Sequence, residues 1–454
     1  MGTVRLALLI LFLVAPSIPA MNVGRYASAM TQGQTKSFVS ANGSALYLDG
    51  RPMRFFGVNH ADLVWSFIQP DSIAENGAEV LDEAASYNIT VVRYGAIGYT
   101  PDQVKLWITD KGHFWAGYDR LIDTASALHI YIIPTLLWNP KQFPALVNER
   151  PQDVFRNGTL SNGLFNSFVR ELVTRYRNAT TIIMWEIGNE LNLLTKPRTN
   201  YYTIQELRTF MKEITSLIRD IDSNHLIGSG MAAPPHDVNP TIQDALSSFL
   251  TVNGFVDVAS IHTYPCDNAG RLTGTSYPCD QNGLVYGISE FDYLKQFYSS
   301  SQTMSKPLMI GEYGDNLQIN PQSNFSLGVL AAASSLKIPL SLMWEWMVPP
   351  DRDPATRLIW NVDPQQTPFM VSVLQRYSLA TMTQTSSNTA AMTETKAASI
   401  QKTTISASSS SLLMPIQPVS TTGTGSTYVV AAIGIISLLA VTVIVFGKRR
   451  RRNV

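Results

Sequence analysis

The sequence is poor in cysteine, balanced in charge and without the common cofactor signatures, and each absence excludes a class of protein. Only two of the 454 residues are cysteine, too few for a small domain held together by disulfides. Lys plus Arg and Asp plus Glu both number 34, and this net charge of +0 gives no indication of a nucleic-acid partner. No histidines cluster at the spacing of metal ligands, and no glycine-rich phosphate loop follows the first predicted strand. We therefore expect neither a metal ion nor an organic cofactor.

Both ends of the chain carry segments typical of membrane targeting. Residues 1–20 contain a short apolar run behind a basic residue, which is typical of a signal peptide. Residues 428–446 form an uninterrupted apolar stretch of membrane-spanning length, and the basic tail 447–454 follows it. Positive charge beside a spanning helix favours the cytoplasmic side. The sequence thus predicts a type I single-pass protein of the cell surface, with the bulk of the chain outside the cell.

The composition between these segments predicts one folded domain and one stalk. Residues 378–427 are dominated by Ser, Thr and Ala, a composition that cannot bury enough apolar surface to fold. We expect this disordered stalk to carry a folded domain over residues 37–377. Cys266 and Cys279 fall in one short stretch of that domain and are expected to form a disulfide in a secreted chain. Glycosylation sequons, which fit an extracellular surface, begin at Asn42, Asn88, Asn157, Asn178 and Asn324.

Short apolar strands alternate with helical segments throughout the folded domain, which indicates an α/β fold. The eight predicted strands are 53–59, 90–94, 130–137, 180–188, 225–229, 256–262, 306–312 and 338–346. Eight strands interleaved with helices are typical of the (β/α)8 or TIM barrel, and an open doubly wound sheet is the alternative. Ahead of the first strand, Asn42-Gly43 and Asp49-Gly50 are hairpin turn signals. We expect this N-terminal hairpin to close the bottom of the barrel.

Two of the predicted strands end in a glutamate. Residues 184–190 run from an apolar strand through Gly188 to Asn189 and Glu190, and residues 306–314 end in a second Gly-flanked glutamate, Glu312. In a parallel barrel, chemistry takes place at the carboxyl ends of the strands. Two carboxylates across one site are what glycosidic bond cleavage requires, because one must donate a proton and the other must be ionised. A solvated loop carboxylate is the alternative for either glutamate alone.

Other strand ends carry groups that would serve such a site. Arg93 ends the second strand, and a guanidinium near Glu312 would lower the pKa of that carboxyl group. His262 and Tyr264 follow the sixth strand and share a face. Tyr264 would hydrogen-bond the ionised glutamate, and His262 would orient sugar hydroxyls or the network. The alternatives are a structural salt bridge for Arg93 and a satisfied core histidine for His262.

Aromatic and polar residues at the remaining strand ends are candidate sugar contacts. Trp344 and Trp346 share a face of the last strand, where an indole offers a flat platform for a sugar ring, although either suits a core equally well. Glu186 precedes Glu190 by four residues, shares its face of the strand and is expected to support the site without entering the chemistry. The other candidate subsite residues are Asn59, His60 and Trp138, with Trp65 and Trp115 as weaker candidates.

In this order, the motifs resemble glycoside hydrolase family 5, the cellulase and β-mannanase family of a large retaining clan built on (β/α)8 barrels. The resemblance covers residues 37–377, and the anchored stalk is not part of the family pattern. The residues that carry it are Asn189-Glu190 after Trp185-Glu186, His262-x-Tyr264, Glu312, Arg93 and Trp344.

The resemblance implies a role for each of these residues. Glu190 would be the acid/base, Glu312 the nucleophile, and Asn189 a contact to the sugar 2-hydroxyl. Trp344, or Trp346 in its place, would lie at the subsite beside the scissile bond. The residues implied to support the nucleophile are Arg93, His262 and Tyr264.

We therefore expect a monomeric, retaining, endo-acting hydrolase of a β-1,4-linked polysaccharide, either cellulose or another β-glucan or β-mannan. Glu312 would attack the anomeric carbon while Glu190, its pKa raised by its neighbour's charge, protonates the leaving oxygen. Retention requires the two carboxyl groups to lie about 5–5.5 Å apart. The alternatives are an exo-acting glycosidase or transglycosylase of the same clan, and a catalytically silent carbohydrate-binding protein of the cell surface.

Overall fold

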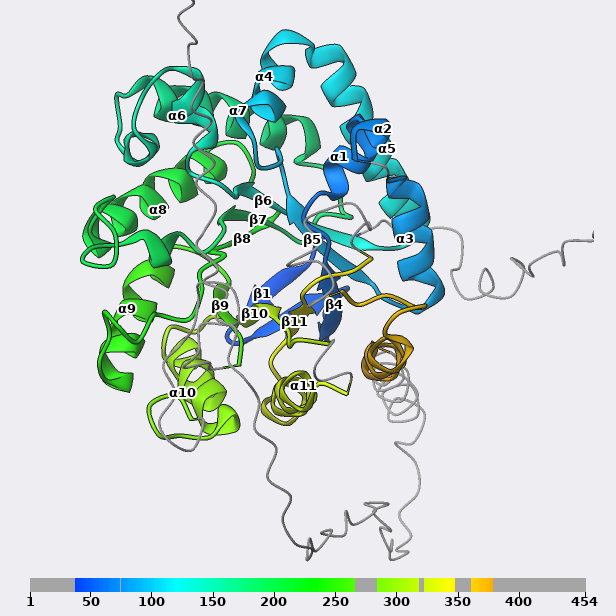
Figure 1. Cartoon of the computed structure of the whole chain (residues 1–454), viewed down its shortest axis with the longest axis vertical. Helices are drawn as coiled ribbons and strands as arrows, with labels where there is room; N and C mark the ends of the chain where they lie inside the picture. The colour runs from blue at the N-terminus through cyan, green and yellow to red at the C-terminus, as the bar shows by residue number, and fades with distance from the viewer. Residues whose placement is uncertain (1–36, 74, 266–283, 318–321, 348–360, 379–454) are drawn as a thin grey trace, which may run out of the picture. The chain divides into compact units, whose positions relative to one another are not determined.

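Eight parallel strands form a sheet that closes on itself, with the helices arranged around it (Figure 1). The computed structural model describes residues 37–73, 75–265, 284–317, 322–347 and 361–378. The neighbours in the sheet run β8-β7-β6-β5-β4-β11-β10-β9, and a parallel bridge between Gly228 and Val258 joins its two ends. This is the predicted (β/α)8 barrel, and the open doubly wound alternative is wrong. The strands are β4 (Phe55–Asn59), β5 (Val91–Gly95), β6 (Tyr131–Leu137), β7 (Met184–Gly188), β8 (Leu226–Gly228), β9 (Ala259–Thr263), β10 (Leu308–Tyr313) and β11 (Leu340–Met343).

The helices present apolar stripes to the outside of the barrel. In α8, a capping box between Thr203 and Glu206 starts the helix, and buried Leu207, Phe210 and Ile214 follow at helical spacing. A last helix over residues 368–378 packs its apolar side into the same core. The helices are α1 (Leu63–Ile68), α2 (Pro70–Ile73), α3 (Gly77–Ser86), α4 (Pro101–Thr109), α5 (Lys111–Ala127), α6 (Gln142–Leu146), α7 (Leu160–Tyr176), α8 (Ile204–Arg219), α9 (Ile242–Asn253), α10 (Glu290–Thr303) and α11 (Asn324–Leu336), with the short 3-10 helices η1 (Pro151–Phe155) and η2 (Leu191–Leu194).

A small antiparallel sheet closes the bottom of the barrel, as predicted. It consists of β1 (Ser40–Asn42), β2 (Ala45–Leu48) and β3 (Arg51–Met53). Asp49 and Gly50 both have positive φ, at 52° and 72°, which is the two-residue turn that matches the twist of a hairpin. Val39 and Leu46 are buried against apolar residues of seven strands and of the segments before β7 and β9: Phe55, Val91, Ile133, Ile183, Met184, Leu226, Val258, Met309, Leu340 and Leu342.

Two predicted strands are shorter by at least four residues in the structure than in the sequence interpretation. The fourth begins at Met184, because the preceding run is reduced to a single bridge between Ile132 and Ile182. The eighth ends at Met343. Side-chain alternation therefore does not extend to residues 344–346, which matters for the site below.

Several predicted segments lie outside the described residues. These are the signal peptide 1–20, the spanning segment 428–446, the tail 447–454, Cys266 and Cys279, and the stalk 378–427 apart from its first residue. That residue, Ser378, is helical, and its hydroxyl donates to the carbonyl oxygen of Phe56. Within the described ranges, no helix is long and apolar enough to cross a membrane.

Candidate active site

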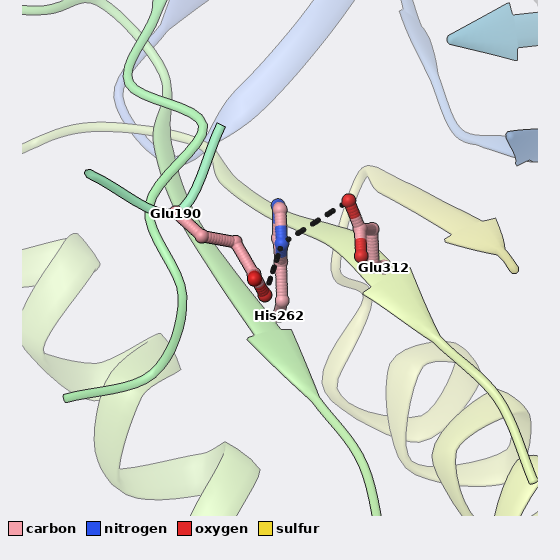
Figure 2. Close-up of side chains that lie close together, drawn as sticks. All are labelled: Glu190, His262 and Glu312. Atoms are coloured by element: carbon pink, nitrogen blue, oxygen red, sulfur yellow. Dashed lines mark hydrogen bonds and ion pairs between the residues drawn. The ribbon is translucent and has the colours of Figure 1, made fainter. Parts of the chain in front are cut away.

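The site is built at the carboxyl ends of four barrel strands. Arg93 lies on β5, Glu190 follows β7, His262 lies on β9 and Glu312 on β10. Because parallel strands end at one mouth of the barrel, these side chains converge. Figure 2 shows Glu190 and Glu312 reaching toward each other, with the imidazole of His262 between their carboxyl groups.

The backbone holds Glu190 in a left-handed conformation. Its φ is 52°, which is uncommon for a residue with a side chain and costs about 1 kcal/mol or more. The Glu190 N–H donates to the carbonyl oxygen of Gly230 at 2.7 Å, which fixes the turn after β7. Gly230 has a φ of 68°, and a Cβ there would collide with the carbonyl oxygen of Gly188. Close contact between these glycines therefore aims the Glu190 side chain into the mouth.

Arg93 is fully buried and binds four side-chain oxygens at once. Its Nε donates to Glu186 Oε2 at 2.7 Å and its Nη2 to Asn189 Oδ1 at 2.7 Å. Its Nη1 donates to Glu312 Oε1 at 2.8 Å and to Asn59 Oδ1 at 3.0 Å. A rigid guanidinium fork of this kind fixes the direction of each acceptor. Arg93 therefore sets the positions of Glu312 and Asn189, and Glu186 balances its charge from below.

Glu312 is held at both carboxylate oxygens. Oε1 accepts from Arg93, and Oε2 accepts from the hydroxyl of Tyr264 at 2.8 Å. Burial and the charge of Glu190 raise the pKa of Glu312, while Arg93 and the Tyr264 hydroxyl oppose that rise. Donors on both oxygens favour the ionised form.

Neutral His262 connects the two glutamates. Its Nδ1 lies 3.1 Å from Glu190 Oε1 and 3.4 Å from Glu312 Oε1. Burial lowers the pKa of His262 to about 4, so the imidazole is uncharged near neutral pH and Nδ1–H donates to a carboxylate. The Nε2 edge lies so close to Gly311 that a Cβ there would stand 2.7 Å from it. This contact explains the glycine that precedes Glu312 in the sequence.

Glu190 has fewer partners than Glu312 and holds its proton more tightly. Burial raises the pKa of Glu190 to about 7, although the charges of Arg93 and Arg198 act in the opposite direction. The sequence predicts that the neighbouring carboxylate causes this rise, whereas in the structure its main cause is burial. The Glu190 side chain remains 20% exposed, which leaves room for an incoming group.

Aromatic side chains form one wall of the mouth. Trp344, directly after β11, lies 6.0 Å from Trp138 between ring centroids, with their planes tilted by 32°. Trp138 in turn lies 4.7 Å beneath the guanidinium of Arg93 and 5.6 Å from the ring of Tyr99. Since Trp344 is partly exposed and Trp138 is 9% exposed, this wall offers an indole surface to a ligand.

Two candidate subsite residues prove to be internal supports. Asn59 is fully buried, and its Nδ2 donates to the carbonyl oxygen of Gly311 at 3.0 Å. His60 is 2% exposed and uses both ring nitrogens, one 2.7 Å from the carbonyl oxygen of Trp346 and the other 3.0 Å from Glu75. The expectation that they contact sugar is therefore wrong.

Three of the candidate tryptophans belong to the core. Trp346 is fully buried, and its indole N–H donates to the carbonyl oxygen of Val80 at 3.4 Å. It was placed beside Trp344 by strand alternation, which fails because β11 has already ended. Trp65 lies buried within α1, and Trp115 packs in α5 against neighbouring aromatic rings. Their expected role in a cleft is wrong.

Sequence reasoning missed three residues near the site. Tyr99 and Glu345 lie close enough to Glu312 for mutual charge effects, and Arg198 lies close to Glu190. Glu345 stands between two tryptophans in the sequence, a signal that was read for its aromatic residues alone. Tyr99 and Arg198 lie in loops, and loop positions carry no periodic signal.

Among the described residues, Glu190, His262 and Glu312 also bring atoms that could bind a metal ion close together. One atom each of Glu190, His262 and Glu312 lies within 4.8 Å of the others. His262 Nδ1 is hydrogen-bonded to Glu190, and Glu312 is already held by Arg93 and Tyr264. The arrangement therefore suits proton transfer at the two glutamates better than it suits metal binding, which requires short distances between the ion and its ligands.

The barrel and the paired glutamates at its mouth define the framework of a glycoside hydrolase. Residues 46–347, well over half of the chain, match the family described as cellulase (glycosyl hydrolase family 5). The chain therefore belongs to glycosyl hydrolase family 5, as the motif resemblance indicated.

Curated relatives and solved structures agree with this family. The chain is 25% identical over 317 residues to mannan endo-1,4-beta-mannosidase 5 of Solanum lycopersicum, covering 62% of this chain and 71% of that protein. It is 21% identical over 343 residues to mannan endo-1,4-beta-mannosidase A of Hypocrea jecorina, covering 69% and 71%. Among solved structures, the endo-1,4-beta-mannanase of Rhizomucor miehei matches 76% of this chain and 100% of its own, with a TM-score of 0.58 and 18% identity. At this identity the structural match establishes the fold alone.

Proposed function

We propose that this protein is a retaining, endo-acting β-1,4-mannanase in which Glu312 is the nucleophile and Glu190 the acid/base. The observation that carries the mechanism is the spacing of the two glutamates. A carboxylate oxygen of Glu190 and one of Glu312 lie within 4.8 Å of each other. Retaining glycosidases hold their carboxyl groups about 5–5.5 Å apart, whereas inverting enzymes need about 6.5–9.5 Å to admit a water.

The first step uses the different protonation states of the two acids. Glu312, held at both oxygens by Arg93 and Tyr264, attacks the anomeric carbon as a carboxylate. Glu190, with a pKa of about 7, carries the proton that passes to the departing glycosidic oxygen. The buried group of Arg93, Glu186 and ionised Glu312 sums to one negative charge, which favours the positive character of an oxocarbenium-like transition state.

The second step returns the enzyme to its starting state. When Glu312 becomes an ester, its negative charge disappears from the vicinity of Glu190, which has given up its proton. Glu190 then accepts a proton from water as that water attacks the anomeric carbon and releases Glu312. His262, neutral and within hydrogen-bond distance of Glu190, holds that carboxyl group in place during the exchange.

The surrounding residues position the sugar. Asn189, oriented through Arg93, presents its amide to the sugar 2-hydroxyl, and Trp344 offers its ring to the apolar face of the same sugar. Tyr264 supports Glu312 through its hydrogen bond to Oε2. These roles follow the family resemblance and agree with the contacts described above.

The names of the related proteins indicate which substrate to propose. The relatives cited above are named as hydrolases of mannan, and this favours β-1,4-mannan over cellulose or another β-glucan. We further propose that the enzyme acts as a monomer outside the cell, held at the membrane by residues 428–446. The hydropathy of that segment and the apolar run within residues 1–20 support this location.

Polysaccharide digestion tests the function. Full-length protein is incubated with galactomannan, glucomannan, carboxymethyl cellulose and a mixed-linkage β-glucan, and viscosity and reducing ends are measured together. Endo action on mannan predicts a steep fall in viscosity for few new reducing ends. Release of short sugars without loss of viscosity would indicate exo action, and retention of polymer without hydrolysis would indicate a binding protein.

Azide rescue tests the two roles separately. Glu312→Ala with an activated aryl β-glycoside and azide is expected to yield a glycosyl azide of inverted configuration, because azide occupies the place of the nucleophile. Glu190→Ala is expected to yield an azide of retained configuration, because the glycosyl-enzyme still forms. The opposite pairing of variants and products would exchange the assignments.

A further inference from the structure

Glu345 leaves one carboxylate oxygen free at the edge of the mouth. Its Oε1 accepts the Ala61 N–H at 3.0 Å. Within the described residues, Oε2 has no hydrogen-bond partner, and it is not among the fully buried atoms that lack one. The side chain is partly exposed. An accessible oxygen on an anchored carboxyl group is therefore available to a ligand.

A structural carboxylate in the same barrel looks different. Asp222 at the bottom uses both oxygens, with Oδ1 accepting two backbone N–H groups and Oδ2 accepting from Trp185 and His225. Buried polar groups are normally satisfied in this way. Glu345 departs from that pattern at the one oxygen that faces away from its anchor.

Tyr99 is a second group of the same kind. Its ring is fixed nearly perpendicular to Trp138, at 71° and 5.6 Å, and its hydroxyl has no partner among the described residues. The charges of Glu345 and Glu312 both act on this phenol, which places Tyr99 near the two carboxyl groups. Glu345 and Tyr99 thus present an acceptor and a hydroxyl beside the indole wall.

These groups lie on the nucleophile's side of the site. Glu345 follows β11, which is paired with β10, the strand that carries Glu312. Ala61 follows β4 and Tyr99 follows β5, whereas the acid/base Glu190 follows β7. Trp344 is the proposed platform for the sugar that Glu312 attacks, so Glu345, next to it in the sequence, and Tyr99, beside Trp138, are placed to meet the adjoining sugar.

We propose that Glu345 and Tyr99 form a hydroxyl-binding subsite for the second sugar on the glycone side of the scissile bond. The inference rests on the proposed function. It adds two residues that decide which glycosidic bond of the polymer lies between Glu190 and Glu312. One sugar hydroxyl donates to Glu345 Oε2, and a second exchanges a hydrogen bond with the Tyr99 hydroxyl. A partly buried site built to hydrogen-bond a substrate hydroxyl rejects a substrate that lacks this hydroxyl, because the polar groups of the site are then left unpaired.

The cleavage pattern of an end-labelled oligosaccharide tests this subsite. β-1,4-Mannopentaose, labelled with ¹⁸O at its reducing end, is digested by the full-length wild type and by Glu345→Ala, Glu345→Gln and Tyr99→Phe, with cellopentaose in parallel. The ratio of the cleaved bonds is measured by mass spectrometry, and this ratio is independent of enzyme concentration and of the folded fraction. Glu79→Ala, an exposed change on α3, is the control.

The subsite predicts a shift in register. Glu345→Ala should change the ratio of cleaved bonds by up to about tenfold, the upper end of the loss expected for one side-chain hydrogen bond. Glu345→Gln should change it less, because an amide oxygen still accepts, and Tyr99→Phe should change it about threefold. Equal slowing at every bond with an unchanged ratio would overturn the subsite and leave Glu345 as an anchor for Ala61. A wild type that cleaves neither pentaose would overturn the proposed function together with the subsite.

Discussion

The two ends of the barrel contain buried carboxylates with opposite properties. At the bottom, hydrogen bonds from His225 and Trp185 overcome the effect of burial and lower the pKa of Asp222 to about 2. At the mouth, burial raises the pKa of Glu190 to about 7. Both side chains are largely removed from water, so the number of donors around each carboxyl group decides its charge. The carboxylate at the bottom has all its hydrogen bonds and serves stability. The carboxyl group of Glu190 at the mouth has fewer hydrogen bonds and serves chemistry.

Removal of the Glu312 carboxylate is expected to have the largest effect at the mouth. Glu312→Gln retains the shape of the side chain but cannot form the glycosyl-enzyme, so kcat on mannan should fall by about 10⁴-fold or more. The protein should remain folded, because glutamine keeps the length of the side chain and its amide oxygen still accepts a hydrogen bond in the buried network. Initial rates and thermal melts of the same preparations check this. A variant that retains a tenth of the activity would exclude Glu312 as the nucleophile.

Glu190→Gln should lower activity and raise stability together. The loss of acid/base catalysis predicts a fall of about 10²–10⁴ in kcat on polysaccharide. The folded-state pKa of Glu190 is raised, so the carboxyl group favours the folded state below about pH 4.5 and loses this contribution as the pH rises through about 7. Glutamine does not ionise, so the variant should be more stable than the wild type at pH 8, by about 1–3 kcal/mol, and equal to it at pH 4.

Chemical denaturation at pH 4, 6 and 8 measures this crossover. Asp82→Asn, an exposed change on α3, is the control and should show no comparable gain at pH 8. A Glu190→Gln protein with the same stability difference at every pH would mean that Glu190 titrates normally.

Asp222→Asn should show the reverse pattern at the bottom. The amide would turn an N–H toward donors that now meet a carboxylate, and the variant should lose about 1–3 kcal/mol of stability with kcat unchanged. Because the folded-state pKa of Asp222 is depressed, its contribution is present above about pH 4 and is lost as the pH falls toward 2. The destabilisation should therefore shrink in acid. Denaturation curves from pH 7 to pH 3 check the trend, and a large fall in kcat at pH 7 would contradict the separation of the two ends.

Elements with a regular spacing of apolar residues could be predicted from the sequence, and residues outside such patterns could not. The barrel, the closing hairpin and the positions of Glu190, Glu312, Arg93 and His262 at strand ends all follow from apolar runs that stop at recognisable residues. Trp346 was misplaced because alternation was extended beyond the end of β11.

Loop residues and electrostatic causes were not predictable in the same way. Burial as the main cause of the raised Glu190 pKa depends on how many neighbours surround one carboxyl group, which no local pattern encodes. The unsatisfied oxygen of Glu345 is visible only once Ala61 has been placed beside it.

The smallest predicted effect concerns Arg198, a charge at the rim of the mouth. Its guanidinium lowers the pKa of Glu190, but its side chain is 24% exposed and lies 3.6 Å from Asp237, so its influence is partly neutralised. Arg198→Ala should therefore shift the basic limb of the pH dependence of kcat/KM upward by about 0.2–0.5 pH units, because Glu190 keeps its proton to higher pH.

Arg208→Ala removes the same charge from an exposed position on α8, where the guanidinium covers the ring of Phe255, and serves as the matched control. The wild type should lose activity with an apparent pKa near 7, the Arg208 variant should follow it, and the Arg198 variant alone should be displaced. Coincident profiles for all three proteins would mean that solvent screens Arg198 from Glu190. The protonation of Glu190 would then be set by its burial alone. The difference from Asp222, whose charge is set by its hydrogen bonds, would be larger.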